Sequence, residues 1–521
     1  MDIEAKTSAA GETVARAAVV IMVVTLVSRL LGFVRDAAIA AAFGATGATD
    51  AYLVAYTLPN SLQAVLGVAF VTVIVPVVTA YLVRGQREEG WHVASAVLNW
   101  TGLVLAVMTA VGMGLAPWMV RLIAPGFTPE EVLFTTHLTR IMFPSIIFMG
   151  TGMFISGILN AGRFFTVPAM ATGVANVVII LAVLALGPHF YMEGVAWGTL
   201  AGFVGFLLVQ LPNLKAMGFR YSFTFDRKHP AVRRVALLIG PVFLAVSVNQ
   251  VYLAMNRFFA SGLERGLITA LDLGNRALNL PGIFVYAVYT ATFPALAEQV
   301  VRRDREGLTR TLNQGLGMML LAIIPASVGM MVLREPVVSL LYQRGAFDQQ
   351  ATWATATALL YFLVGFPAQA ANQVLNRTFY AMEDAGTPVK VGLVSVLLNA
   401  GLSLALLPGM GHGGLALSNS LAAIANTVIL LLALRKPLPG VSLPRLFVSV
   451  LRVGVASLVM GAITFLGAGW LEGILDTGRL GQLLVFLAIT VALGAAVFIA
   501  ASLALRVEEV RSLRRLIRRA R

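Results

Sequence analysis

Of the six arginines that lie inside long apolar stretches of the sequence, where a charged side chain is costly, three could form one site. Arg29 and Arg35 fall in the first stretch, within Ser28-Arg29-Leu30-Leu31-Gly32-Phe33-Val34-Arg35-Asp36, and Arg276 falls in a later one. If the first stretch is a membrane-spanning helix, Arg29 lies about 18 Å into it. A charge at that depth costs roughly 2.5–3.5 kcal/mol even on a lenient insertion scale. We therefore expect Arg29 to face protein or water and to bind a ligand.

Helical geometry groups the polar residues of this stretch. At about 100° per residue, Arg29 and Asp36 lie on one side of the helix, and Ser28 and Arg35 lie together on another. Guanidinium groups bind phosphate and carboxylate oxygens bidentately, so we predict an anion site that includes Ser28, Arg29 and Arg35. Gly32 would permit a helix break that lets both arginines converge. The alternative is a structural ion pair between Arg35 and Asp36, which leaves Arg29 unexplained.

Two further acidic residues could support this site. Asp272 precedes Arg276 by four residues, the favourable order for an ion pair on a helix. This pair either serves helix packing alone, or Asp272 orients Arg276 toward Arg29 and Arg35. Asp50 lies at the outer end of the second apolar stretch, where it supports the site or caps that helix. Both alternatives remain open for each acid.

Composition determines the class of protein. Of 521 residues, 58% are hydrophobic and 12% are charged, and there is no cysteine. In soluble domains, about 45–50% of residues are hydrophobic and about 25% are charged. The five histidines are scattered, and no nucleotide-binding loop is present. We therefore predict a polytopic helical membrane protein that is a transporter rather than an enzyme. We expect no cofactor, no metal site and no catalytic residue, with transport driven by a coupling ion or the membrane potential.

Apolar runs of span length predict fourteen transmembrane helices, with both chain ends in the cytoplasm. Alternate loops, beginning with the N-terminal one, contain 27 Lys and Arg residues, against 5 in the opposite set. This asymmetry places the basic set on the cytoplasmic side. The net charge of +14 is thus mainly a topology feature and does not predict nucleic-acid binding. The predicted spans are 17–42, 51–82, 92–120, 133–160, 167–187, 194–214, 235–258, 267–297, 310–333, 351–378, 388–408, 413–434, 446–470 and 480–505.

An internal repeat divides most of the chain. Asp50 with Leu58-Pro59 recurs as Asp272 with Leu280-Pro281, Phe143-Pro144 as Phe366-Pro367, and Asn176 as Asn399, at offsets near 222. Six helices separate the copies, so both copies share one orientation across the membrane. We predict two parallel six-helix bundles, 1–215 and 216–436, and a region 437–521 with two extra helices and a basic tail. Such bundles alternately open a central cavity to each side of the membrane.

The motifs resemble those of the MurJ (MviN) lipid II flippase family, within the multidrug/oligosaccharidyl-lipid/polysaccharide exporter superfamily. The similarity lies in the first span, in Thr49-Asp50-Ala51-Tyr52 with Leu58-Pro59-Asn60, in Ala124-Pro125-Gly126-Phe127, and in Arg344-Gly345-Ala346-Phe347. The resemblance implies a flippase that moves an undecaprenyl-pyrophosphate-linked peptidoglycan precursor to the outer leaflet of the bacterial cytoplasmic membrane. It also implies that Arg29, Arg35 and Arg276 bind the pyrophosphate and that Asp50 is important for function. The last two helices are expected to form a groove for the lipid tail.

The chain departs from the family pattern at three places. Gln63-Ala64 stands where members usually carry an Arg, 66–69 lacks a common Glu, and Asn279 replaces another Glu. A paralogue for another polyprenyl-linked or anionic substrate is therefore one alternative. A cation-coupled drug exporter and a transport-inactive scaffold are two more. The expected partners are the lipid-linked precursor, membrane lipids and the cell-wall synthesis machinery, and we expect a monomer.

Overall fold

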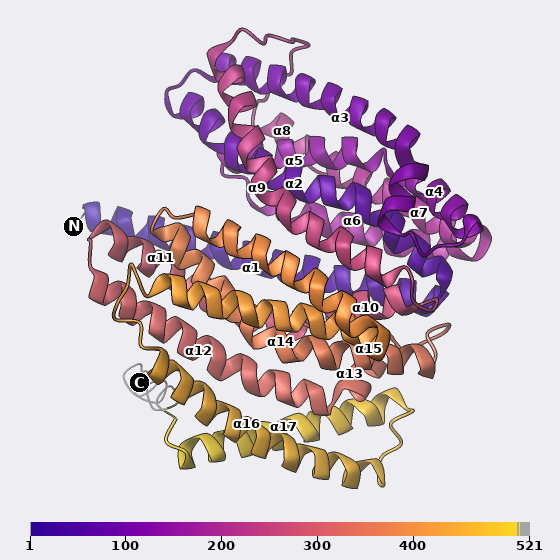
Figure 1. Ribbon diagram of the computed structural model, residues 1–521. Coiled ribbons are helices and arrows are strands. Elements are labelled where there is room, and N and C mark those ends of the chain that lie inside the picture. The colour runs from indigo at the N-terminus through magenta and orange to yellow at the C-terminus, as the bar shows by residue number, and fades with distance from the viewer. Residues whose placement is uncertain (1, 508–509, 511–521) are drawn as a thin grey trace. The chain divides into compact units, whose positions relative to one another are not determined.

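A computed structural model describes residues 2–507 and 510, and the elements in this part are all helices (Figure 1). The all-helical prediction is confirmed. The chain forms two compact units, Met1–Gly266 and Leu267–Arg521. The helices of the first unit are α1 (Asp2–Phe43), α2 (Gly47–Val83), α3 (Arg87–Ile123), α4 (Pro129–Met142), α5 (Ser145–Ala161), α6 (Thr166–Ala185), α7 (Gly187–Leu208), α8 (Leu211–Ala216) and α9 (Pro230–Ala260). Those of the second are α10 (Leu267–Ala277), α11 (Asn279–Val301), α12 (Arg305–Val332), α13 (Arg334–Tyr342), α14 (Gln349–Ala381), α15 (Gly386–Leu434), α16 (Leu443–Glu472) and α17 (Leu480–Ala504).

Each of the fourteen predicted spans falls on a helix or on a helix with a short break. The 49 residues of α15 would extend about 74 Å, more than twice the hydrocarbon thickness of a bilayer. Gly411 interrupts α15 with φ 54° and ψ −135°, so the element contains two helices, as the sequence predicts. Within the described residues, nine helical segments are long and apolar enough to cross a membrane, with α15 counted as one.

The internal repeat is visible in backbone geometry. Tyr191 interrupts α7 with φ 52° and ψ −137°, nearly the values at Gly411, which lies 220 residues later. Between α5 and α6, Arg163 has φ 67°, and between α14 and α15, Glu383 has φ 63°, again 220 residues apart. The two halves therefore share the same turns. The division of the chain into 1–215, 216–436 and 437–521 stays a prediction. The first compact unit extends beyond residue 215, because α9 packs on α2 and α3.

Proline breaks the two halves at different places. Proline lacks an N–H and crowds the preceding turn, so it often interrupts a helix. In the first unit, α4 and α5 separate at Pro144, whereas α14 continues through the equivalent Pro367. Conversely, α2 continues through Pro59, whereas α10 ends at Ala277, just before Pro281. The span predicted at 267–297 is thus two helices.

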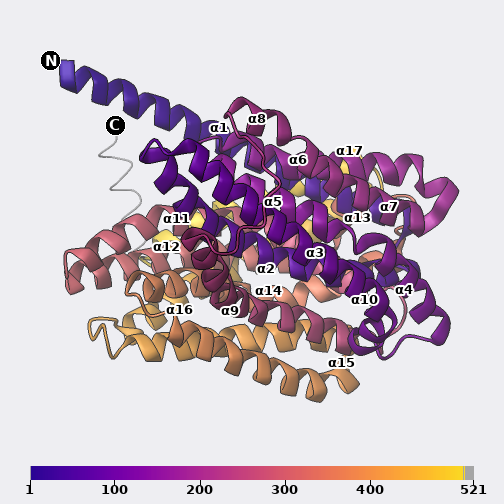
Figure 2. The same ribbon diagram turned by 90° about the horizontal axis from the view of Figure 1, so that it is seen from above.

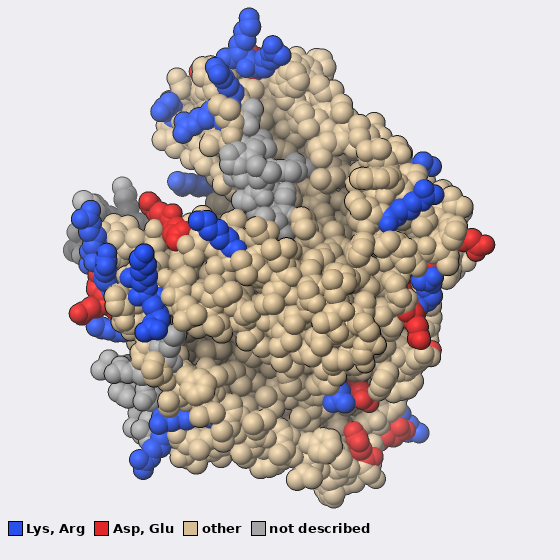
Figure 3. Space-filling view, viewed as in Figure 1, with Lys and Arg blue, Asp and Glu red and all other residues tan. Residues whose placement is uncertain are grey.

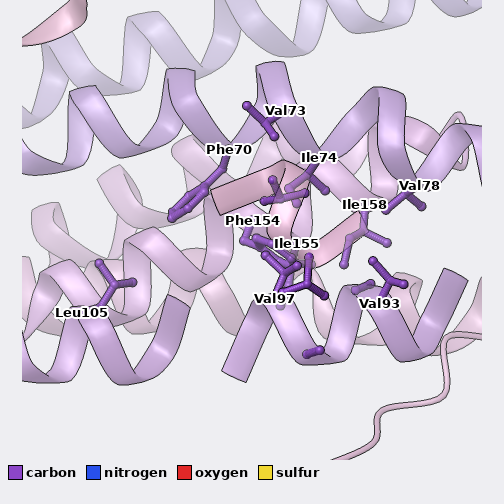
Figure 4. Close-up of a cluster of buried hydrophobic side chains, with 14 of the residues drawn as sticks. Phe70, Val73, Ile74, Val78, Val93, Val97, Leu105, Phe154, Ile155 and Ile158 are labelled. Carbon is purple, nitrogen blue, oxygen red and sulfur yellow. The ribbon is translucent and has the colours of Figure 1, made fainter. Parts of the chain in front are cut away.

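Apolar packing holds each unit together. In the first, α2, α3 and α5 enclose buried side chains that include Phe70, Ile74, Val97, Phe154 and Ile158 (Figure 4). In the second, α14 packs against α15, α12 and α10, and the last two helices, α16 and α17, pack against each other. Charged side chains gather near helix ends and leave wide uncharged surfaces (Figure 3), as a membrane protein requires.

Candidate functional site

The predicted anion site lies on α1 where this helix runs beside α6 (Figure 2). Ser28 is buried, and its Oγ donates a hydrogen bond of 2.9 Å to the Ala169 carbonyl of α6. Arg35, two turns later on the same side of α1, also reaches α6. The predicted grouping of Ser28 with Arg35 is therefore present in the structure.

Asn176 of α6 links these two residues. Its Oδ1 accepts a 3.0 Å hydrogen bond from Arg35 Nη1, and its Nδ2 donates a 3.2 Å hydrogen bond to the Ser28 carbonyl. The amide is buried, so a change to an apolar side chain would leave polar groups of α1 without these partners. Sequence reasoning missed Asn176 as a site residue. Its only sign was its place in the repeat, where Asn399 corresponds to it.

The ion pair between Arg35 and Asp36 is present. Asp36 Oδ1 accepts from Arg35 Nε at 3.0 Å and from Nη2 at 2.7 Å, and the two side chains are only 16% and 11% exposed. Together with Asn176, this carboxylate holds the guanidinium in one orientation. A guanidinium whose orientation is set in advance loses less conformational entropy when it binds an anion.

Gly32 does not break α1, which is helical from Asp2 to Phe43. The prediction of a break there is wrong, and packing explains the glycine instead. A Cβ atom at position 32 would lie 3.3 Å from Asn176 Nδ2, closer than most real contacts. On the opposite helix, a Cβ atom at Gly173 would lie 3.0 Å from Ser28 Oγ. Both glycines thus allow α1 and α6 to approach closely enough for the Asn176 contacts.

Arg29 differs from its neighbour Ser28 because its side chain is exposed. One residue of helix turns a side chain by about 100°, which takes Arg29 off the face that packs on α6. The part of Arg29 in anion binding stays a prediction.

The second unit contains the predicted pair on α10. Arg276 Nε donates to Asp272 Oδ2 at 2.5 Å, and the side chains are 28% and 14% exposed. The expected i, i+4 ion pair is therefore present, while its predicted approach to Arg29 and Arg35 stays a prediction. Asn279 begins α11 and is exposed. Gln63 lies in α2, and its side chain is outside the described residues.

Asp50 does not cap α2, contrary to one of the two expectations. Thr46 is the N-cap residue, and its backbone N–H donates to Thr49 Oγ1 at 2.8 Å. Asp50, buried in the first turn of α2, instead accepts a 2.6 Å hydrogen bond from the Gly266 N–H. This bond ties α2 to the chain immediately before α10.

Neighbouring loops at the same end of the first unit reinforce this connection. Arg265 forms an ion pair with Glu131 and lies over the Phe127 ring, 5.8 Å from its centroid. The Gly126 N–H donates to Ser261 Oγ at 3.1 Å. Residues 124–127 match a motif of the family, but the sequence does not predict a role for them. In the structure this motif anchors the end of α9.

Comparison with known proteins identifies the family. A family model described as lipid II flippase MurJ matches residues 39–486, which is most of the chain. The lipid II flippase MurJ of Burkholderia cenocepacia is 31% identical over 435 residues, covering 80% of this chain and 84% of that protein. The chain belongs to the lipid II flippase MurJ family. It is therefore a multi-pass membrane transporter rather than an enzyme, as the sequence predicts.

Solved structures agree with this MurJ assignment at the level of the fold. A lipid II flippase MurJ in an inward closed conformation matches with a TM-score of 0.79 and 24% identity, covering 94% of this chain and 99% of that one. A multidrug resistance MATE family transporter of the MOP superfamily, in an inward-facing conformation, matches with a TM-score of 0.66 and 16% identity, covering 81% of this chain and 98% of that one. A count of about fourteen spans is consistent with the MurJ fold.

Proposed function

We propose that this MurJ-family chain is a lipid II flippase, which moves the undecaprenyl-pyrophosphate-linked precursor of peptidoglycan from the inner to the outer leaflet. The pyrophosphate carries the negative charge that the arginines of α1 can bind. Alternating access by the two repeated bundles would transfer this head group while the polyprenyl chain stays in lipid.

The orientation of Arg35 carries the proposal at the residue level. Asp36 and Asn176 hold its guanidinium on a largely buried face of a membrane helix. Charges in such places are costly and usually serve function. Exposed Arg29, six residues earlier on α1, supplies a second guanidinium for the same anion.

The other functions considered have less support. A paralogue for another polyprenyl-linked or anionic substrate would use the same arginines, and the changes at Gln63 and Asn279 are what favour it. A drug exporter coupled to a cation would need a membrane carboxylate that is available to the cation. Asp36 and Asp272 each form an ion pair with an arginine instead, and Asp50 accepts from Gly266.

We also propose the membrane arrangement. The distribution of basic residues supports both termini in the cytoplasm and residence in the bacterial cytoplasmic membrane. We propose that the protein acts as a monomer near the cell-wall synthesis machinery. Transport would be driven by an ion gradient or the membrane potential, without a bound cofactor.

Complementation tests the function. Wild-type protein should restore growth to a bacterium depleted of its own MurJ, and Arg29→Ala and Arg35→Ala should not, at normal membrane levels. Arg140→Ala is the matched control, because Arg140 is exposed and its Nε donates a 3.1 Å hydrogen bond to the Met113 carbonyl. Full rescue by both α1 variants would refute the proposed site, and failure of the wild type would refute the function.

A further inference from the structure

The segment between α8 and α9 is not helical (Figure 1). It exposes a row of aromatic side chains. Tyr221, Phe223 and Phe225 are 55%, 81% and 39% exposed. The residues between them, Ser222 and Thr224, are half-buried. This alternation is that of an extended chain with one face against the protein and one apolar face outward. We call residues 219–228 the aromatic segment.

Side chains of α3 satisfy the backbone of the aromatic segment. Asn99 Nδ2 donates to the Ser222 carbonyl at 3.2 Å and to the Thr224 carbonyl at 2.8 Å. Trp100 Nε1 donates to the Phe225 carbonyl at 3.2 Å. An irregular backbone next to lipid needs such partners, because water is scarce there. A loop immersed in water would gain little from them.

The aromatic segment dips along α3 and returns. Arg220 Nη1 lies 3.3 Å from Glu88 Oε1 near the start of α3, whereas Phe225 packs edge-on against Trp100, with ring centroids 5.4 Å apart. Twelve residues of helix separate Glu88 from Trp100, about 18 Å. The chain then turns back, and His229 Nε2 lies 3.4 Å from Glu89 Oε1. Phe223 and Phe225 are thus near the deepest point of the dip.

The length of α3 is compatible with a position of this point at the membrane boundary. Its 37 residues extend about 55 Å, but about 20 residues cross the hydrocarbon core. If the last 20 residues of α3 span the core, Asn99 and Trp100 lie at the boundary between head groups and acyl chains. Aromatic side chains are enriched at this depth.

The charge of the aromatic segment also fits a lipid surface. Arg227 and Lys228 follow the aromatic residues and are exposed, and Figure 3 shows basic side chains gathered at this end of the first unit. The Asp226 side chain is 36% exposed, and its Oδ2 lies 3.7 Å from His92 Nε2 of α3. Desolvation acts to raise the pKa of Asp226, but hydrogen bonds from the N–H groups of Lys228 and His229 and from the His92 side chain, together with the His229 charge, lower the pKa below its ordinary value. The outward surface is therefore aromatic and basic, which suits an anionic leaflet.

We propose that the aromatic segment anchors the chain to anionic phospholipid. Tyr221, Phe223 and Phe225 insert between head groups, while Arg227 and Lys228 bind lipid phosphates. The anchor holds the linker between α8 and α9 against α3. This proposal does not depend on the transported substrate, because it concerns the surface of the bilayer and not the arginines of α1.

A fluorescent label tests the depth of insertion. Since the chain has no cysteine, Phe223→Cys creates a single site for the dye NBD. In nanodiscs that contain phosphatidylglycerol, the emission should shift to the blue, and lipids with a shallow doxyl group should quench it at least threefold more than at Arg87→Cys. Arg87 is exposed at the start of α3 and serves as the matched aqueous site. Equal quenching at the two positions would overturn the proposal.

A variant without the two basic side chains tests the preference for anionic lipid. The blue shift at position 223 should be larger in phosphatidylglycerol than in phosphatidylcholine nanodiscs, and Arg227→Gln with Lys228→Gln should abolish this difference without lowering Tm. If the labelled protein that keeps Arg227 and Lys228 shows an equal blue shift in both lipids, the proposed binding to anionic lipid is refuted. A dye that stays exposed in nanodiscs and is shielded only by added protein would instead favour a protein partner and overturn the proposal. Lipid II transport is measured separately, so failure of one proposal leaves the other testable.

Discussion

At the residue scale, Asn176 determines how Arg35 is presented. Ser28, Arg35 and Asp36 are close in sequence, so their helical positions could be predicted from periodicity. Asn176 is 141 residues from Arg35, and only the packing of α6 on α1 shows that its amide contacts both Arg35 and the Ser28 carbonyl. The sequence showed it as one repeated asparagine in an apolar stretch, which is too weak a pattern to assign a partner.

Replacing Asn176 tests this role. Asn176→Ala removes one hydrogen bond to a charged group and one to a carbonyl, so we expect a loss of about 1–3 kcal/mol in unfolding free energy. Growth rescue should fall while membrane levels stay normal, because Arg35 loses its fixed orientation. Val177→Ala on the same helix, where the side chain is 39% exposed, should change both measurements little. Equal effects of the two variants would contradict the role of Asn176.

At the scale of elements, the repeated turns carry different residues in the two halves. Tyr191 and Gly411 share backbone angles that L-residues rarely adopt. Tyr191 is compensated in part by its edge-on contact with Phe43, with ring centroids 5.4 Å apart. The helical hairpins on either side of these turns could be predicted from hydrophobicity, but the angles at the turns could not.

A glycine substitution tests the second turn. Gly411→Ala should lower the unfolding free energy by about 1–3 kcal/mol, because its φ of +54° is strained for any residue with a Cβ atom. Gly409→Ala is the control, since a Cβ atom there meets nothing within 4 Å. Thermal unfolding in detergent measures both variants. A Gly411→Ala protein as stable as Gly409→Ala would show that the turn tolerates a side chain.

The loop that anchors the end of α9 makes a similar prediction. A Cβ atom at Gly126 would lie 2.5 Å from the Ser261 carbonyl, which is backbone and cannot move aside easily. Gly126→Ala should therefore lower Tm clearly, by an amount expected for overpacking of about 1–3 kcal/mol. Gly262→Ala lies in the same region with no atom within 4 Å of its Cβ and should have little effect. Matching losses in the two variants would rule out this packing explanation.

At the scale of the whole molecule, the spans were predictable and the connections were not. Long apolar runs predict helices because every backbone group in lipid must be bonded within the chain, and all fourteen predicted spans fall on helices. The break at Gly32 and the cap at Asp50 were wrong, and the division of span 267–297 into α10 and α11 was not predicted. Each depends on contacts with distant residues, such as Asn176 and Gly266, or on which proline interrupts its helix. Sequence spacing carries no information about these.

The most direct test of the whole account is the exposure of lipid II on the outer leaflet. In a bacterium depleted of its own MurJ, cells that produce this protein should present lipid II to an enzyme that cleaves it only from outside. Cells that produce Arg35→Ala at the same membrane level should not, because the guanidinium positioned by Asp36 and Asn176 is missing. Equal exposure with Arg35→Ala, or no exposure with wild-type protein in the membrane, would contradict the account.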